Sequence, residues 1–118
     1  MIRDLAFATV LAGAAGLAAP ALAHHGWNEY DASRTVTLTG AIEKNGYEHP
    51  HGYITLTADG KRWTAVLAPP SRMDNRGLAR GLLVPGTVVT VVGYANRNVT
   101  DEMRAERIVI GGRTVELR

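Results

Sequence analysis

The sequence predicts a mainly β protein, namely a small OB-like Greek-key barrel of five to six strands with one short helical segment between strands three and four. Short stretches of alternating apolar and polar residues recur through most of the chain, and glycine-rich turns separate them. A single segment between the third and fourth predicted strands has a helical composition. This order of elements is that of the OB fold, which we therefore prefer to a generic β-sandwich.

Local patterns predict the first three strands. Residues 35–44 alternate with many β-branched side chains, and Gly40 inside this strand predicts a bend or bulge at a barrel corner. Residues 52–58 and 61–68 flank Asp59-Gly60, a strong signal for a two-residue hairpin because a type I′ turn requires positive φ at both positions. The inward-facing residues of this hairpin are expected to be Ile54, Leu56, Ala58, Trp63, Ala65 and Leu67.

The rest of the chain supplies the helical segment and the later strands. Pro69-Pro70 ends the third strand, and in the helical segment we expect Ser71 to cap the first turn and Gly77 to end it. Residues 87–95 predict a fourth strand, with Val89, Val91 and Gly93 facing inward. Residues 104–110 and 114–117 predict a final hairpin through Gly111-Gly112, which supplies the strand that closes the barrel and an extra edge strand.

Residues 1–23 have the organisation of a cleaved signal peptide, with a charged start, an apolar run and a small-residue finish. Ala21-Leu22-Ala23 fits a signal-peptidase site, and Ala19-Pro20-Ala21 allows cleavage two residues earlier. The apolar run is shorter than a membrane span, so we expect no stable membrane insertion after processing. The expected organisation is a signal peptide (1–23), an N-terminal arm (24–34) and an OB-like domain (35–118), in a periplasmic or secreted bacterial protein.

Composition narrows the function classes. The chain has no cysteine, so the predicted export is not accompanied by a disulfide framework. Its formal net charge is +2, and basic residues are interspersed with acidic ones rather than clustered. This pattern, together with export, argues against nucleic acid as a partner.

The order of several motifs resembles a known family. These motifs are His24-His25, Trp27 and Asp31 of the arm, 36–40, Pro50-His51, Pro69-Pro70-Ser71 to Leu78, and Pro85-Gly86-Thr87 to Tyr94. Together they resemble a group of small exported bacterial proteins known only as a domain of unknown function, over nearly the whole mature chain. The resemblance implies a secreted β-barrel with no established activity. It also implies that His24, His25 and His51 match the recurring histidines of the family, whereas His49 stands where the family usually has asparagine.

All four histidines fall in two short groups, His24-His25 and His49-Pro50-His51. Cleavage after Ala23 would make His24 the first residue, and its amine and imidazole could then chelate one ion, as in the histidine-brace arrangement of some exported copper proteins. Cleavage after Ala21 would put histidine third, which resembles the amino-terminal copper and nickel motif. Because imidazole favours such metals and Cu²⁺ ranks highest among them, copper is the candidate cofactor. The candidate metal ligands are His24, His25, His49 and His51.

The two groups can share an ion only under two conditions. His49 and His51 would point to the same side if their segment were extended, as Pro50 favours. The arm and this segment would also have to lie at the same end of the domain, which requires the chain to fold back. The alternative interpretation is that the first pair is solvated and that His51 makes a structural hydrogen bond near a turn.

A second function hypothesis needs no metal. An OB-like module could bind a small molecule, a glycan or a protein partner through Tyr53, Trp63 or Tyr94. Catalysis is not expected, because the chain has no cysteine nucleophile, no G-x-S-x-G elbow and no phosphate-binding glycine loop.

Overall fold

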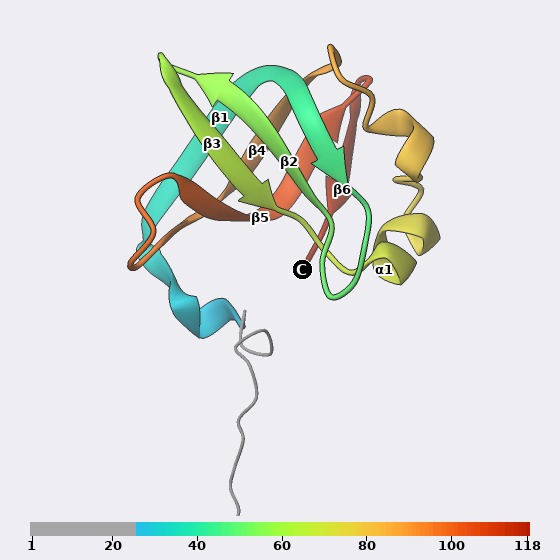
Figure 1. Cartoon of the computed structure of the whole chain (residues 1–118). Helices are drawn as coiled ribbons and strands as arrows, with labels where there is room; N and C mark the ends of the chain where they lie inside the picture. Colours follow the sequence, from blue (N-terminus) through green and yellow to red (C-terminus); the bar gives the residue numbers. More distant parts are fainter. Residues whose placement is uncertain (1–25) are drawn as a thin grey trace, which may run out of the picture.

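A computed structural model describes residues 26–118 (Figure 1). The predicted signal peptide and both of its possible cleavage sites lie outside the described residues. The candidate ligands His24 and His25 also lie outside them. The elements are the 3₁₀ helix η2 (Trp27–Glu29), β1 (Tyr30–Gly46), β2 (Tyr53–Ala58), β3 (Lys61–Val66), α1 (Pro70–Asn75), the 3₁₀ helix η3 (Arg80–Leu82), β4 (Val88–Asn96), β5 (Glu102–Ile110) and β6 (Arg113–Glu116). Within residues 26–118, no helix is long and apolar enough to cross a membrane.

The strand pairings close a ring. β1 pairs antiparallel with both β2 and β4, β2 with β3, and β4 with β5. A short parallel pairing of Thr64–Val66 with Glu102–Arg104 joins β3 to β5 and completes the circle. β6 pairs with the second half of β5 and lies outside the ring. The ring with its helix between β3 and β4 is the OB arrangement, so the predicted fold class is confirmed.

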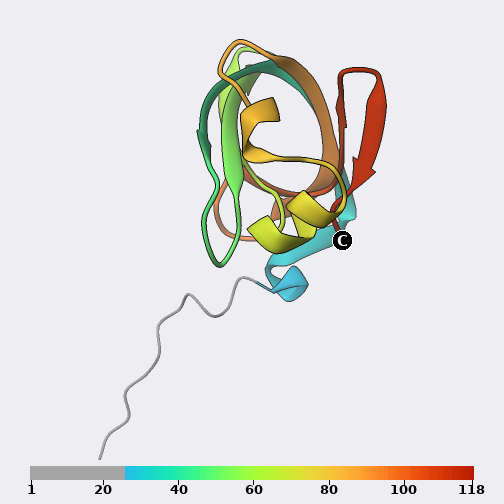
Figure 2. The same cartoon turned by 90° about the vertical axis from the view of Figure 1, so that its right-hand side faces the viewer.

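The core fills the inside of this ring. The inward residues predicted for β2, β3 and β4 are buried, apart from Trp63, which is half-buried against the core. Met73, Leu78 and Leu83 add fully buried side chains from the segment between β3 and β4. Figure 2 shows this helical segment lying across one end of the ring of strands. It therefore closes that end of the barrel with apolar side chains.

Two strands begin earlier than their sequence patterns predict. β1 begins at Tyr30 rather than at residue 35, because the buried Tyr30 pairs with Asn96 of β4 before the register shifts. β5 begins at Glu102 rather than at residue 104, because Glu102 takes part in the pairing with β3. Both extensions depend on partners distant in sequence, which alternation within one segment does not reveal.

The ends of α1 show one confirmed prediction and one that is wrong. Gly77 has φ of +85°, and hydrogen bonds from Gly77 to Asp74 and from Leu78 to Met73 end the helix in a Schellman motif, as predicted. Ser71 does not cap the helix. The N-cap is Pro69, with no side-chain cap, and the helix starts at Pro70, where the missing N–H of proline is tolerated.

Both predicted hairpin turns are present. Asp59 and Gly60 have φ of +54° and +75°, as a type I′ turn requires. Gly111 and Gly112 of the last hairpin also have positive φ.

Candidate functional site

The β3–β5 seam positions a row of outward-facing side chains. Tyr53, Val66, Arg104 and Tyr94 are successive cross-strand partners on β2, β3, β5 and β4. Ligands of OB folds bind on the face of strands 2 and 3, between the β1–β2 and β4–β5 loops. Here these loops are residues 47–52 and 97–101, so His49 and His51 lie on the loop that borders this face.

A groove is present at this position. It has a cavity volume of about 280 Å³, is open to solvent on one side and is predominantly apolar. We call it the seam groove. Its walls come from the β1–β2 loop, β2, β3 and the start of β5: Pro50, His51, Gly52, Tyr53, Thr64, Val66 and Glu102.

Glu102 is the carboxylate in the wall of the seam groove. Its Oε2 accepts hydrogen bonds from the hydroxyl of Tyr30 and, at 3.2 Å, from the side-chain amide of the buried Asn96. Burial raises the pKa of Tyr30, and the hydrogen bond to Glu102 raises it further. Tyr30 is therefore a neutral donor that fixes the orientation of this carboxylate.

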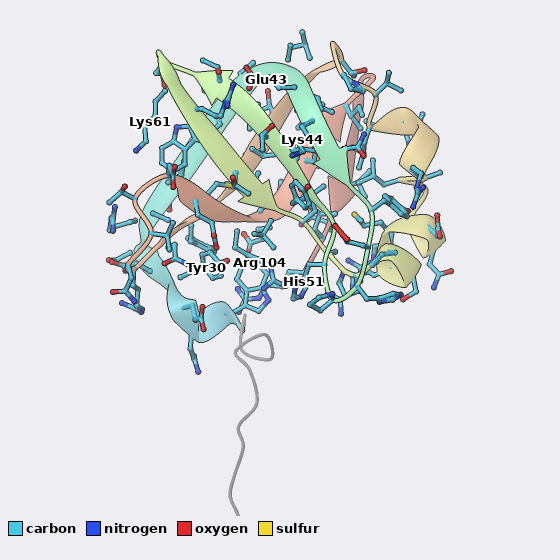
Figure 3. All side chains as sticks on the ribbon, in the orientation of Figure 1. Tyr30, Glu43, Lys44, His51, Lys61 and Arg104 are labelled. Carbon is cyan, nitrogen blue, oxygen red and sulfur yellow. The ribbon has the colours of Figure 1, made fainter. Side chains whose placement is uncertain are left out.

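Arg104 is the buried cation of this face, and the residue is only 3% exposed. Burial lowers the pKa of Arg104, although a guanidinium remains protonated at neutral pH. Its Nη2 lies 3.3 Å from Nε2 of His51. Because a guanidinium can only donate, this contact requires Nε2 of His51 to be the unprotonated acceptor. Figure 3 shows Tyr30, Arg104 and His51 along the same edge of the barrel.

Trp27 attaches the N-terminal arm to this edge. The guanidinium carbons of Arg104 and Arg118 lie 4.4 Å and 4.3 Å from the Trp27 ring centroid, within the range of cation–π interactions. Tyr30 and Tyr94 contact the same ring edge-on, with centroids 6.5 Å and 6.3 Å away. Trp27 and Tyr30 therefore hold the arm on the barrel.

The structure meets one of the two conditions for a shared metal site. Arg104 contacts both Trp27 of the arm and His51 of the β1–β2 loop, so the chain does fold back and bring these segments together. The other condition fails, because His49 and Pro50 lie in a bend rather than in an extended segment. His49 is exposed, whereas His51 is half-buried.

The metal ligands remain a prediction. In the part of the chain that the structure describes, no group of three or more His, Cys, Asp or Glu residues could hold a metal ion. Two of the four predicted ligands, His24 and His25, lie outside that part. Of the aromatic residues predicted to bind a ligand, Tyr53 lines the seam groove and Tyr94 contacts Trp27. Nζ of Lys61 lies 4.3 Å from the ring centroid of the third, Trp63.

Sequence reasoning did not identify Glu102, Arg104 or Asn96 as site residues. Glu102 lies between the predicted strands 87–95 and 104–110, and Arg104 is the first residue of the second of these. No sequence motif surrounds either residue. Their place in the site results from the pairing of β5 with β3, which local sequence does not reveal. Asn96 follows the predicted fourth strand, and its burial shows only in the folded chain.

The chain is similar to one protein family in sequence and to several solved structures in fold. Residues 12–104 match a family described as "Family of unknown function (DUF6152)". No curated protein matches the chain. Solved structures with a similar fold include four crystal structures of TiaS, a tRNAIle2 agmatidine synthetase.

The TiaS complex with tRNA(Ile2), AMPCPP and agmatine has a TM-score of 0.52 and 23% identity over 69% of this chain and 19% of that one. The complex with tRNA(Ile2) and ATP has a TM-score of 0.51 and 23% identity, covering 75% and 20%. A ZRD-deleted mutant with agmatine has a TM-score of 0.50 and 22% identity, covering 75% and 25%. The chain spans a quarter or less of these proteins, and the likeness shows the fold alone.

Proposed function

The chain belongs to the family of unknown function DUF6152, and we propose that it is an exported, non-catalytic β-barrel protein that binds one transition-metal ion, with copper preferred. The proposed ligands are the amine and imidazole of His24 and a ring nitrogen of His51, with His25 and His49 as alternates. One observation carries this proposal: Arg104 contacts both the arm at Trp27 and the loop at His51.

Chain connectivity links the arm to the loop. His25 lies two residues before Trp27, so its Cα can be at most about 7 Å from the Cα of Trp27. Trp27 is itself held against Arg104, whose guanidinium reaches His51. A mature chain that starts at His24 would have its amine only three residues before Trp27, which supports a site shared by the two segments.

The chemistry of the residues favours copper. A terminal histidine offers an amine and an imidazole that can bind one ion together, and Cu²⁺ ranks first among the divalent metals for such nitrogen donors. The contact with Arg104 selects a His51 ring whose Nε2 carries a lone pair, as a metal ligand requires. A metal at Nε2 would replace the guanidinium as the partner of that nitrogen.

Titration of metal-free mature protein with Cu²⁺ tests the proposal. Wild-type protein with a native amino terminus is expected to bind one ion, and its affinity should fall as pH drops through about 6.5, where imidazole protonates. His24→Ala should weaken binding most, because it removes the imidazole of the chelate ring, and His51→Ala should weaken it less. His49→Ala tests the alternate ligand on the same loop and should weaken binding less than His51→Ala, because His49 is exposed whereas His51 makes the contact with Arg104. Equal affinity in all four proteins, or no binding by wild type, would contradict the proposal.

The seam groove favours a second function, the metal-free binding module expected of an OB-like fold. Its position on the face between the β1–β2 and β4–β5 loops supports this function. Among these structures, TiaS is seen in a complex that contains tRNA(Ile2) and agmatine. At this identity the likeness supports no such ligand for the present chain, whose scattered charges favour a partner other than nucleic acid.

A further inference from the structure

We propose that the seam groove binds a small organic amine. The protonated amino group would lie at the carboxylate of Glu102, and the apolar body would pack against Pro50, Tyr53 and Val66. This site shares His51 with the proposed metal site but needs no metal, so it is expected to work in metal-free protein.

The carboxylate of Glu102 has capacity for a ligand. Both of its hydrogen bonds, from Tyr30 and Asn96, go to Oε2, and across residues 26–118 none goes to Oε1. No Lys, Arg or His of the described residues lies within ion-pair distance of it. A half-buried carboxylate without a counter-charge is costly unless something supplies one. A protonated amine supplies both the charge and the hydrogen-bond donor.

The neighbouring cation does not neutralise Glu102. Arg104 is two residues along β5, but its guanidinium lies over Trp27 and donates to His51, and it makes no hydrogen bond to Glu102. His51 accepts from Arg104 through Nε2, which requires a ring that is unprotonated at that nitrogen. The charge that lines the groove is therefore that of Glu102.

The groove also limits the size and shape of the ligand. Its volume of about 280 Å³ is just below the usual range for small-molecule sites, roughly 300–1,000 Å³, so a compact ligand is expected. The lining is mainly apolar, which favours a hydrocarbon or aromatic body. Tyr53 adds an aromatic side chain whose ring face attracts a cation.

Three probes that share a phenyl group but differ in charge test this inference. We would titrate metal-free mature protein, in the presence of EDTA, with 2-phenylethylamine, 2-phenylethanol and 3-phenylpropionate, and follow backbone amide shifts by NMR. The amine should bind most tightly and the acid most weakly. Shifts should concentrate at Tyr53, Thr64, Val66 and Glu102. Equal affinity for the three probes, tighter binding of the acid, or shifts elsewhere on the barrel would overturn the proposal.

Glu102→Gln isolates the charge, since glutamine keeps an oxygen that Tyr30 and Asn96 can still donate to. Affinity for the amine should fall about tenfold while affinity for the alcohol is unchanged, because a hydrogen bond to a charged group is stronger than a neutral one. Glu43→Gln is the matched control, since Glu43 lies outside the groove and pairs with Arg62. Unchanged amine affinity in Glu102→Gln would refute the inference and leave the copper proposal intact.

Discussion

At the scale of single residues, Arg104 and Trp27 connect parts of the chain that are far apart in sequence. Arg104 is buried on the outer side of the β3–β5 seam and contacts the arm as well as the β1–β2 loop. The guanidinium of Arg118 also lies over the Trp27 ring. The attachment of the arm at Trp27 therefore depends on side chains that are not proposed ligands, and their effect on metal binding can be tested.

Trp27→Ala should weaken Cu²⁺ binding by about tenfold or more without removing a ligand. The variant loses the cation–π contact that holds the arm against Arg104. Metal binding must then order the arm, and the entropy lost in doing so lowers the affinity. Cu²⁺ titration of mature protein that starts at His24 measures the effect. Trp63→Ala is the control, because Trp63 lies on β3 beside Lys61. Wild-type affinity in Trp27→Ala would show that the arm needs no such anchor.

Tyr47 gives a pH-dependent prediction. Burial, together with the hydrogen bond to Asp74, raises the pKa of Tyr47 from the unfolded value near 10 to about 12. Its hydroxyl lies 2.8 Å from Asp74 Oδ1 and 2.8 Å from the carbonyl oxygen of Leu78. The neutral phenol is favoured in the folded state, so its contribution is complete below pH 10 and is lost as the pH rises towards 12.

Urea unfolding at pH 9 and pH 11.5 tests this prediction. Wild type should lose more stability between the two pH values than Tyr47→Phe, which cannot ionise. Tyr30, whose pKa is also raised, remains in both proteins and contributes the same loss to each. An equal loss in wild type and Tyr47→Phe would contradict the assigned role of Tyr47.

At the scale of elements, the features that depend on neighbouring residues in the chain could be predicted from the sequence. The Asp59-Gly60 turn, the buried faces of β2, β3 and β4, and the glycine end of α1 all follow from residues adjacent in sequence. The starts of β1 and β5 do not, because they depend on the pairing of Tyr30 with Asn96 and of Glu102 with Thr64. The same pairings create the seam groove, so its carboxylate and its buried arginine could not be found from sequence.

Gly60→Val should destabilise the β2–β3 hairpin by about 1 kcal/mol or more. Gly60 has φ of +75°, which a β-branched side chain adopts only with strain. Gly81→Val is the matched control, since Gly81 also has open space around it but does not have a positive φ. Chemical unfolding compares the two. Equal stability losses would show that the turn does not require glycine.

At the scale of the whole molecule, the closed ring brings both ends of the described chain to one edge. Trp27, near the start of that chain, lies under the guanidinium of Arg118 at its end, and His51 is reached through Arg104. The candidate histidines and the leader can be predicted from sequence, but the proximity of the arm at Trp27 to the loop at His51 cannot, because it depends on the path of β1 and on the β3–β5 pairing. The central claim is that the mature terminus and His51 hold one ion together.

The most direct measurement is a double-mutant cycle of Cu²⁺ affinity. It compares protein that starts at His24 with protein that carries an additional methionine before His24, each with and without His51→Ala, after intact-mass analysis confirms the first residue. The added methionine removes the terminal amine from the His24 chelate. We predict tight binding only with the native start, and a loss on His51→Ala that is larger there than in the extended protein. Equal affinity for both starts, or no effect of His51→Ala on the native one, would contradict the account.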